Sequence, residues 1–446
     1  MRELIKNLHT VAFLTLGCKV NQYDTQAMRE IFLENGFKET GFDEVADVYV
    51  INTCTVTGNG DKKSISALRR AYKLNPDSEI VVAGCMAQRT PDHFRTFPGV
   101  RLVLGTQRRG EVVELLQYAI QQNVNLIAAT DLKEMKYEEL EVSSNEGHTR
   151  AVLKIQEGCN RFCSYCIIPY VRGQIHSRPI ENIYNEACRL AENGYQEIVV
   201  TGIHLTSYGA EMNPRKRLSD AIDAIHKVPN VKRIRLGSLE PVIITDEFLE
   251  ALRNMPKVCR QFHLALQSGS DAVLSRMRRR YTTDEYFTAC QKLRKVFPEC
   301  AITTDIITGF PGETEEEFIE TFEFCKKIGF AKMHVFPYSE RSGTVAASMN
   351  HSIPKAVRQE RAKRLIALGN ELRQSAEYSM IGKTENVLVE EIEKNSAIGY
   401  TSTYFRCMIN TESEDCLLPG MMIPVKITGC SLDSLESVPY KEGDNG

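Results

Sequence analysis

Three cysteines stand close together in the run EGCNRFCSYC, where Cys159, Cys163 and Cys166 follow a C-x₃-C-x₂-C spacing. Three thiolates in one short loop favour a soft metal centre. A closed [4Fe–4S] site takes four cysteines, as in ferredoxins, so three cysteines leave one iron without a protein ligand. Because an open iron can bind a reactant, this spacing predicts an enzyme rather than an electron carrier.

A zinc site is one alternative for this loop. Structural zinc normally takes four Cys or His ligands, with the pairs separated by a longer spacer. No second cysteine pair follows within 20 residues, although His176 is within reach. Three buried structural cysteines are the other alternative, and they are not expected in a loop that contains Asn160, Arg161 and Tyr165. The iron–sulfur interpretation is therefore favoured.

A second set of three cysteines follows from the topology predicted for residues 1–130. Apolar strands are predicted over 11–18, 48–54, 79–85 and 101–105, with helices over 22–35 and 62–74. This alternation predicts a parallel α/β sheet. Three of the strands end in cysteine, at Cys18, Cys54 and Cys85. Because the carboxyl ends of parallel strands share one edge, we expect these thiols to converge, with three separately buried cysteines as the alternative.

The central part of the chain predicts an incomplete barrel. Residues 131–148 are charged and weakly patterned, and are expected to form a linker. From 149 to 379, six strand–helix units follow, too few for an eight-unit barrel but suited to an incomplete (β/α)6 TIM-like one. The expected strands cover 151–158, 197–203, 232–240, 261–269, 301–310 and 332–339, and a basic helix is expected over 354–374.

Residues 380–446 change to short strands without helices, which predicts a small OB-like β-barrel. The expected strands cover 386–392, 398–409 and 422–430. This segment has 5 Lys+Arg against 11 Asp+Glu, a net charge of −6, whereas a barrel that grips phosphate should be basic. Candidate RNA contacts are a local patch of Tyr404, Arg406 and Lys426, or the clusters Arg278, Arg279, Arg280 and Arg358, Arg361, Lys363, Arg364, although solvated helix faces are the simpler interpretation of the clusters.

The bulk properties indicate an ordinary globular protein of two to four domains. The chain has 446 residues, 42% hydrophobic and 25% charged, with a formal net charge of −3 that gives no indication of nucleic acid. No apolar run approaches the length of a membrane span, and the first residues do not resemble a secretory signal. We therefore expect a cytoplasmic protein whose 14 cysteines are reduced and free to bind metal.

Taken together, the motifs resemble those of a known family. GCNRFCSYC is similar to the cluster motif of radical S-adenosylmethionine (SAM) enzymes, and GCKVNQYD, NTCTVT and AGCMAQ are similar to the amino-terminal domain of the methylthiotransferases. TDIITGFPGET and VFPYSERSGT resemble later strands of that family's barrel, and the last segment resembles a TRAM domain, an RNA-binding appendage. The resemblance covers nearly the whole chain. LGCKVNQYDT with INTCTVT is most like the tRNA threonylcarbamoyladenosine methylthiotransferases, the MtaB group.

The resemblance implies two [4Fe–4S] clusters and SAM as cofactors. Cys159, Cys163 and Cys166 would bind the cluster that cleaves SAM, and Cys18, Cys54 and Cys85 an auxiliary cluster that supplies sulfur. The implied reaction places a methylthio group at carbon 2 of N-threonylcarbamoyladenosine beside the anticodon, after a SAM-derived radical removes hydrogen. The implied partners are tRNA and a low-potential electron donor such as flavodoxin or ferredoxin.

Candidate SAM contacts are expected at the carboxyl ends of the barrel strands. They are Tyr165, Gly202, Ser238, Glu240, Gln267, Asp305 and Phe336. Tyr165 could present backbone atoms to adenine, Gly202 could allow close approach of the methionine part, and Glu240 could meet the ribose or the amino group. The alternative for each is a satisfied polar group at a strand end. His204 and His263 are assigned no role, and the other eight cysteines are expected to be small buried hydrophobes.

Two competing functions stay open. A two-cluster electron-transfer or redox-sensing protein would explain six cysteines, but not a barrel-sized domain behind an incompletely ligated cluster. The same chemistry could also act on a different acceptor, either isopentenyladenosine in tRNA or a ribosomal protein.

Overall fold

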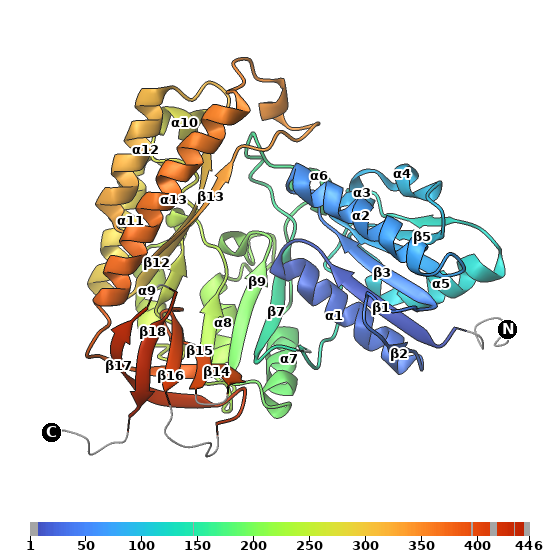
Figure 1. The fold of residues 1–446 in the computed structure, drawn as a ribbon, viewed down its shortest axis with the longest axis horizontal. Coiled ribbons are helices and arrows are strands. Elements are labelled where there is room, and N and C mark those ends of the chain that lie inside the picture. Colours follow the sequence, from blue (N-terminus) through green and yellow to red (C-terminus); the bar gives the residue numbers. More distant parts are fainter. Residues whose placement is uncertain (1–7, 146, 394–395, 411–416, 432, 441–446) are drawn as a thin grey trace.

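The computed structural model describes residues 8–145, 147–393, 396–410, 417–431 and 433–440. Three parts follow one another along the chain: an α/β sheet, a curved parallel sheet with helices outside it, and a small β-barrel (Figure 1). The predicted fold class is therefore confirmed. Within the described ranges, no helix combines the length and the apolar character needed to cross a bilayer.

The amino-terminal sheet is parallel, and in the described residues it has the order β2-β1-β3-β4-β5-β6. Its strands are β1 (Thr10–Thr15), β2 (Lys38–Glu39), β3 (Val48–Thr53), β4 (Glu79–Gly84), β5 (Val100–Leu104) and β6 (Leu126–Ala128). The helices are α1 (Lys19–Glu34), α2 (Gly58–Leu74), α3 (Cys85–Arg89), α4 (Pro91–Arg95) and α5 (Val112–Gln121). β3 is buried along its whole length, because helices cover both faces of a parallel sheet.

The central part is the predicted incomplete barrel. Its parallel strands are β7 (Arg150–Glu157), β9 (Glu197–Gly202), β10 (Arg233–Leu236), β11 (Gln261–His263), β12 (Ala301–Thr308) and β13 (Lys332–Pro337). The helices that follow them are α7 (Ile180–Glu192), α8 (Leu218–His226), α9 (Asp246–Arg253), α11 (Thr283–Val296), α12 (Glu315–Ile328) and α13 (Lys355–Tyr378). Two short helices lie in loops, α6 (Pro169–Arg172) and α10 (Asp271–Arg276).

Two runs of strands make up this barrel. β10, β9 and β7 are continuous, with β8 (His176–Ser177) antiparallel at the edge, and β11, β12 and β13 form the second run. The bridges Ile234 to Val258 and Leu239 to Leu264 connect the two runs. One large apolar core lies between these strands and their helices. The carboxyl ends of all six strands therefore face the same side, where an active site is expected.

The predicted linker is packed against both neighbouring parts. In the described residues 131–145 and 147–148 it contains no helix or strand. Leu140 and Val142 are nevertheless buried, in one apolar cluster with Tyr23 of α1 and Val152 of β7. The hydroxyl of Tyr137 donates to the carbonyl of Lys154 at 2.7 Å. This segment therefore helps to fix the first sheet against the barrel.

The carboxy-terminal barrel is closed, in the order β14-β15-β16-β18-β17. Its strands are β14 (Thr384–Glu393), β15 (Ser396–Tyr400), β16 (Arg406–Asn410), β17 (Met422–Cys430) and β18 (Leu435–Pro439). The prediction of one strand over 398–409 was wrong, because the chain turns at Thr401, whose N–H donates to the carbonyl of Phe405 at 3.0 Å. β18 was not predicted.

Candidate active site

Cys159, Cys163 and Cys166 lie in the loop after β7, at the carboxyl end of a barrel strand. Gly158 makes the turn into this loop with φ of +71°, and a Cβ there would lie 1.6 Å from the carbonyl oxygen of Gln174. Only glycine combines this conformation with so close an approach. The N–H of Cys159 then donates to the carbonyl of Gly173 at 3.1 Å, which fixes the backbone that carries the first thiol.

Residues from loops that follow later barrel strands also hold this loop, which has one internal contact as well. The N–H of Ser164 donates to the carbonyl of Met277 at 3.0 Å, and the carbonyl of Ser164 accepts from the N–H of Ala346 at 2.7 Å. Arg279 Nη1 donates to Sγ of Cys163 at 3.3 Å, and the N–H of Arg161 donates to Sγ of Cys159 at 3.4 Å. Donors to sulfur are one means by which proteins set the potential of an iron–sulfur cluster.

Cys159 and Cys163 are buried, and Cys166 is half-buried beside them. Burial and, to a smaller extent, the neighbouring thiol of Cys163 raise the pKa of Cys159 to about 11 and the pKa of Cys166 to about 12. Without a metal ion, Cys159 and Cys166 are therefore neutral thiols near pH 7. A bound metal displaces such protons, because the thiolate is the ligand. The donor set therefore suits a [4Fe–4S] cluster with one iron left open.

Cys18, Cys54 and Cys85 converge at the carboxyl edge of the amino-terminal sheet, as predicted. Cys18 precedes α1, Cys54 directly follows β3, and Cys85 begins α3 directly after β4. Gly17 has φ of +109°, and a Cβ there would lie 3.1 Å from Sγ of Cys54. Burial, together with the nearby thiols of Cys18 and Cys54, raises the pKa of Cys85 to about 11 against the opposing effect of Arg172. These three cysteines form one cluster rather than three separate core positions.

A short buried segment joins the two sets of cysteines. It begins directly after Cys166, and its residues Ile167 and Val171 pack against Cys85. Arg172, at the end of α6, donates from Nε to Sγ of Cys85 at 3.3 Å. The loop that carries one thiol set is thus in direct contact with the other set.

Arg172 also belongs to a buried network of charges between the two domains. Its Nη1 donates to Oε1 of Glu157 at 2.7 Å and lies 3.3 Å from Oδ2 of Asp24, while Nζ of Lys154 lies 2.6 Å from Oδ1 of Asp24. Burial alone would raise the pKa of Asp24, but Arg109, Lys154 and Arg172 outweigh it and hold that pKa well below its usual range. Asp24 on α1 is therefore an anion that binds the first sheet to the barrel.

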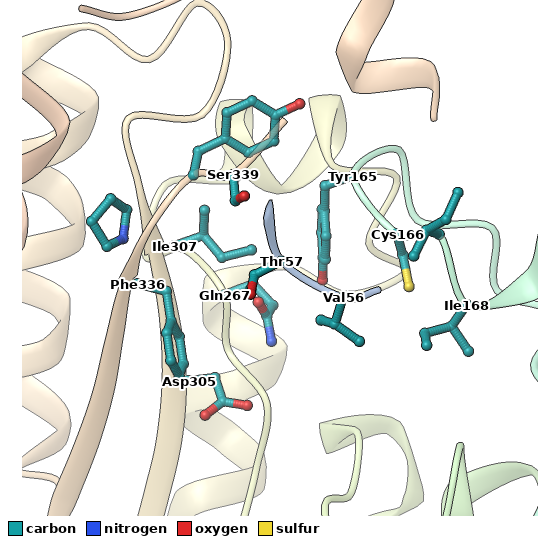
Figure 2. Close-up of a pocket in the computed structure, with 13 residues that line it drawn as sticks. Val56, Thr57, Tyr165, Cys166, Ile168, Gln267, Asp305, Ile307, Phe336 and Ser339 are labelled. Carbon is teal, nitrogen blue, oxygen red and sulfur yellow. The ribbon is translucent and has the colours of Figure 1, made fainter. Parts of the chain in front are cut away.

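A cavity of about 260 Å³ lies between the two domains beside Cys166. It is lined by Val56, Thr57, Tyr165, Cys166, Ile167, Ile168, Gln267, Asp305, Ile307, Phe336, Pro337, Tyr338 and Ser339. Figure 2 shows Asp305, Ile307 and Phe336 on one side, and Tyr165, Cys166 and Ile168 on the other. Four predicted SAM contacts, at Tyr165, Gln267, Asp305 and Phe336, are thus brought together.

The amino-terminal domain contributes Val56 and Thr57 to this cavity, which the sequence did not indicate. They follow Cys54 in a loop that the barrel holds in place. The N–H of Gly58 donates to Oγ of Ser339 at 3.2 Å, and Arg341 Nη2 donates to Oγ1 of Thr55 at 2.9 Å. Both partners come from the loop after β13, so the wall of the cavity depends on contacts between residues far apart in sequence.

The remaining predicted SAM contacts, Gly202, Ser238 and Glu240, do not line the cavity. Glu240 is buried, and its carboxylate lies 2.8 Å from Arg161 Nη2, 3.1 Å from Arg279 Nη2 and 3.1 Å from His204 Nε2. Both arginines contact thiols of the cysteine loop, so Glu240 supports that loop. At Gly202 a Cβ would lie 2.9 Å from Cβ of Gln156, so packing within the barrel accounts for this glycine.

We expect the contribution of Glu240 to stability to depend on pH. Burial raises its pKa, but His204, Arg279 and Arg161 lower it from 4.5 to about 2. A depressed pKa gives stability that is present above about pH 4.5 and is lost as the pH falls towards 2. The difference in melting temperature between the wild type and Glu240→Gln should therefore shrink between about pH 6 and about pH 3. A difference that stayed constant over this range would contradict the assignment, and Glu247→Gln, in an exposed pair with Arg217, is the control.

The predicted RNA contacts are partly corrected. Arg361 is buried against Glu313 at 2.7 Å, and Arg279 is buried against Glu240, so neither is a free phosphate contact. The ring centre of Tyr404 lies 4.9 Å from that of Tyr400 and 4.4 Å from the guanidinium of Arg235. The ring of Tyr404 is therefore already packed against residues of the protein. Arg358 donates to the carbonyl of Tyr338 at 2.6 Å. Exposed candidates that remain are Arg278, Arg280, Lys363, Arg364, Arg406 and Lys426.

The other cysteines largely agree with the prediction of small hydrophobes. Cys259, Cys290, Cys325 and Cys407 are buried, and Cys188, Cys300 and Cys430 are half-buried. Cys416 lies outside the described residues. His263, to which no role is assigned from the sequence, lies with Nε2 3.3 Å from Oδ2 of Asp305, a residue that lines the cavity.

Comparison with known proteins agrees with this geometry. Residues 153–325 match the Radical SAM superfamily, and residues 10–105 match the Uncharacterized protein family UPF0004. A protein of Bacillus subtilis (strain 168) named threonylcarbamoyladenosine tRNA methylthiotransferase MtaB is 44% identical over 97% of this chain and 96% of its own length. A tRNA-2-methylthio-N(6)-dimethylallyladenosine synthase of Acetivibrio thermocellus is 33% identical over 95% of this chain and 89% of its own length.

Solved structures support the fold. The radical S-adenosylmethionine methyltransferase TsrM from Kitasatospora setae, determined with cobalamin and a [4Fe-4S] cluster, aligns with a TM-score of 0.57. The alignment covers 76% of this chain and 77% of that one at 13% identity, so it bears on the fold alone. The radical SAM fold implies one [4Fe–4S] cluster and SAM, for which the Cys159 loop has the donor set. The chain belongs to the radical SAM methylthiotransferase family, is an enzyme of that type, and is most similar in its motifs to the MtaB group.

Proposed function

We propose that this enzyme places a methylthio group at carbon 2 of N-threonylcarbamoyladenosine, beside the anticodon of tRNA. The observation that carries the proposal is the pair of three-cysteine sets, which a short buried segment joins at the edge of one cavity. The name of the Bacillus subtilis relative, 44% identical over nearly the whole chain, supports this acceptor. The proposed division is residues 1–130, a linker over 131–148, the barrel over 149–379 and the β-barrel over 380–446.

Each part has a proposed role. Cys159, Cys163 and Cys166 bind the cluster that holds SAM, and Cys18, Cys54 and Cys85 bind an auxiliary [4Fe–4S] cluster. When bound, these groups supply one-electron cleavage of SAM and a sulfur for transfer. A radical route is required because the C–H bond at carbon 2 of adenine is not acidic enough for an ordinary base. The electron comes from a low-potential donor such as flavodoxin or ferredoxin, and we place the reaction in the cytoplasm with its tRNA substrate.

The residues of the chain position the reactants and exclude water. Tyr165 and Gln267 bound the cavity next to Cys166, where they are placed to contact SAM, as are Asp305 and Phe336. Val56 and Thr57 close the side that belongs to the domain of the auxiliary set. Reacting groups from both domains can therefore meet at one cavity, and such positioning accounts for a large share of enzymatic rate enhancement.

Nucleoside analysis of tRNA tests this proposal. In a strain that lacks the gene and any paralogue, we expect the 2-methylthio derivative of threonylcarbamoyladenosine to disappear, while unmodified threonylcarbamoyladenosine accumulates. The wild-type gene should restore the product, and a Cys163→Ala gene should not. If the 2-methylthio derivative of threonylcarbamoyladenosine persisted and that of isopentenyladenosine were lost, isopentenyladenosine would be the acceptor instead. Unchanged tRNA with an altered ribosomal protein would remove tRNA as the substrate.

A further inference from the structure

A cluster of two histidines and one carboxylate lies on three neighbouring barrel strands. His263 belongs to β11, Asp305 to β12 and His334 to β13, and one ligand atom of each lies within 4.8 Å of the other two. The register of the parallel strands produces this arrangement, because Asp305 pairs with His334 across β12 and β13. His263 pairs with Thr303, two residues before Asp305. The cluster is thus built on rigid sheet rather than on loops.

The distance between two members of the cluster matches one edge of a metal site. Nε2 of His263 lies 3.3 Å from Oδ2 of Asp305. Ligand atoms about 2.0–2.1 Å from a tetrahedral ion are about 3.3 Å apart. Nε2 of His263 is buried and makes no hydrogen bond of good geometry among the described residues, although Asp305 lies close to it. A cation bound between the two groups would satisfy both of them.

A second contact fixes the orientation of His263. Its Nδ1 lies 3.0 Å from Oγ1 of Thr303, which also accepts from Nε2 of Gln261 at 3.0 Å. A proton on Nδ1 that donates to Thr303 leaves Nε2 without a proton, so that its lone pair can bind a cation shared with Asp305. Histidines that bind metals usually donate their other ring N–H in this way, which sets the tautomer.

The cluster borders the active-site cavity. Side chains two residues apart in a strand point to the same face, so Asp305 shares a face with Ile307, and His334 shares a face with Phe336. Asp305, Ile307 and Phe336 line the cavity. His334 is exposed, so an ion from solution can reach it.

We propose that His263, Asp305 and His334 bind a first-row divalent metal ion, separate from both sets of cysteines. Two imidazole nitrogens and one carboxylate oxygen suit Zn²⁺, Fe²⁺ or Mn²⁺ and leave coordination positions open. Asp305 lines the cavity, so an ion bound to Asp305 can take an oxygen or nitrogen ligand from a molecule in the cavity. The alternative is a His263–Asp305 pair that binds no metal. In this alternative His334 has no role, so replacing His334 distinguishes the two.

Zinc binding to the cluster-loaded full-length enzyme tests the site. After equilibration with micromolar Zn²⁺ and gel filtration, we expect the wild type to retain one more zinc per chain than His334→Ala and Asp305→Asn. His334 is exposed, so its replacement should not impair folding. His93→Ala, a histidine in α4 of the other domain, is the matched control and should bind zinc like the wild type. Equal zinc in the wild type and His334→Ala would overturn the proposal.

Two further measurements separate a metal site from structural effects. Thr303→Val should weaken zinc binding by about 10- to 100-fold, as loss of an orienting hydrogen bond does, whereas loss of a ligand should weaken it more. X-ray absorption at the zinc edge should show nitrogen and oxygen at about 2.0–2.2 Å and no sulfur at about 2.3 Å. Sulfur in that shell would mean that the zinc occupies a cysteine site, and would also overturn the proposal.

Discussion

Cys85→Ala is expected to abolish transfer of sulfur while leaving SAM cleavage largely intact. Cys85 lies with Cys18 and Cys54 in the amino-terminal domain, and the SAM-cleaving set lies in the barrel loop. Loss of one of three ligands should remove the auxiliary cluster, so that iron falls from about eight to about four atoms per chain. Methylthiolated product should fall by at least about 100-fold, whereas 5′-deoxyadenosine formed with a strong reductant should stay within about threefold.

A matched control tests whether removing any buried thiol has the same effect as Cys85→Ala. Cys290 is as deeply buried as Cys85 but lies in the apolar core of the barrel, so Cys290→Ala should keep both activities and all of the iron. Cys163→Ala should lose both activities. If Cys85→Ala reduced SAM cleavage as strongly as it reduced sulfur transfer, the two sets would not be functionally separate.

Arg172→Met should lower the free energy of unfolding by about 3–5 kcal/mol, because it leaves buried carboxylates without a partner. The Arg172 guanidinium is 1% exposed and contacts Asp24, Glu157, Asn21 and Cys85. Burial lowers its pKa, but the anionic groups around it raise that pKa well above its usual value, so the charge is present at any working pH. Methionine has similar length but cannot satisfy Asp24 or Glu157. Thermal unfolding followed by circular dichroism measures the effect.

Arg253→Met is the control for this change. Arg253 is 70% exposed and lies 3.8 Å from Glu250, a pair expected to contribute less than about 1 kcal/mol. Asp24 belongs to the amino-terminal domain and Glu157 to the barrel, so the Arg172 variant should also loosen the contact between the domains. Faster hydrogen exchange at α1 and α6 should accompany the lower melting temperature. A melting temperature like that of Arg253→Met would show that the buried network contributes little.

The sequence predicts the sites that depend on local spacing or on simple topology. Cys159, Cys163 and Cys166 can be found from their spacing, because a short loop keeps them together. Cys18, Cys54 and Cys85 are far apart in sequence, but each follows a strand of one parallel sheet, whose carboxyl ends must meet. The strand–helix alternation also predicts the barrel, since helices and strands of this length have distinct hydrophobic periods.

Features that depend on register or on contacts between domains could not be predicted. His263, Asp305 and His334 meet only because β11, β12 and β13 pair in one particular register. Arginine is a residue type that is usually exposed. The burial of Arg172 is evident only once α1 is placed against β7. Tyr404 looked free to stack on a base, but the turn after Thr401 directs its ring onto Arg235.

The most direct test of the central claim is Mössbauer spectroscopy of the ⁵⁷Fe-reconstituted, oxygen-free enzyme, before and after addition of SAM. We expect two [4Fe–4S] clusters per chain, and SAM should shift the signal of one iron in one cluster only. Cys85→Ala should remove the cluster that does not respond, and Cys163→Ala the cluster that does. A single cluster in the wild type, or two clusters in which no iron responds to SAM, would contradict the assignment of the two sets of cysteines.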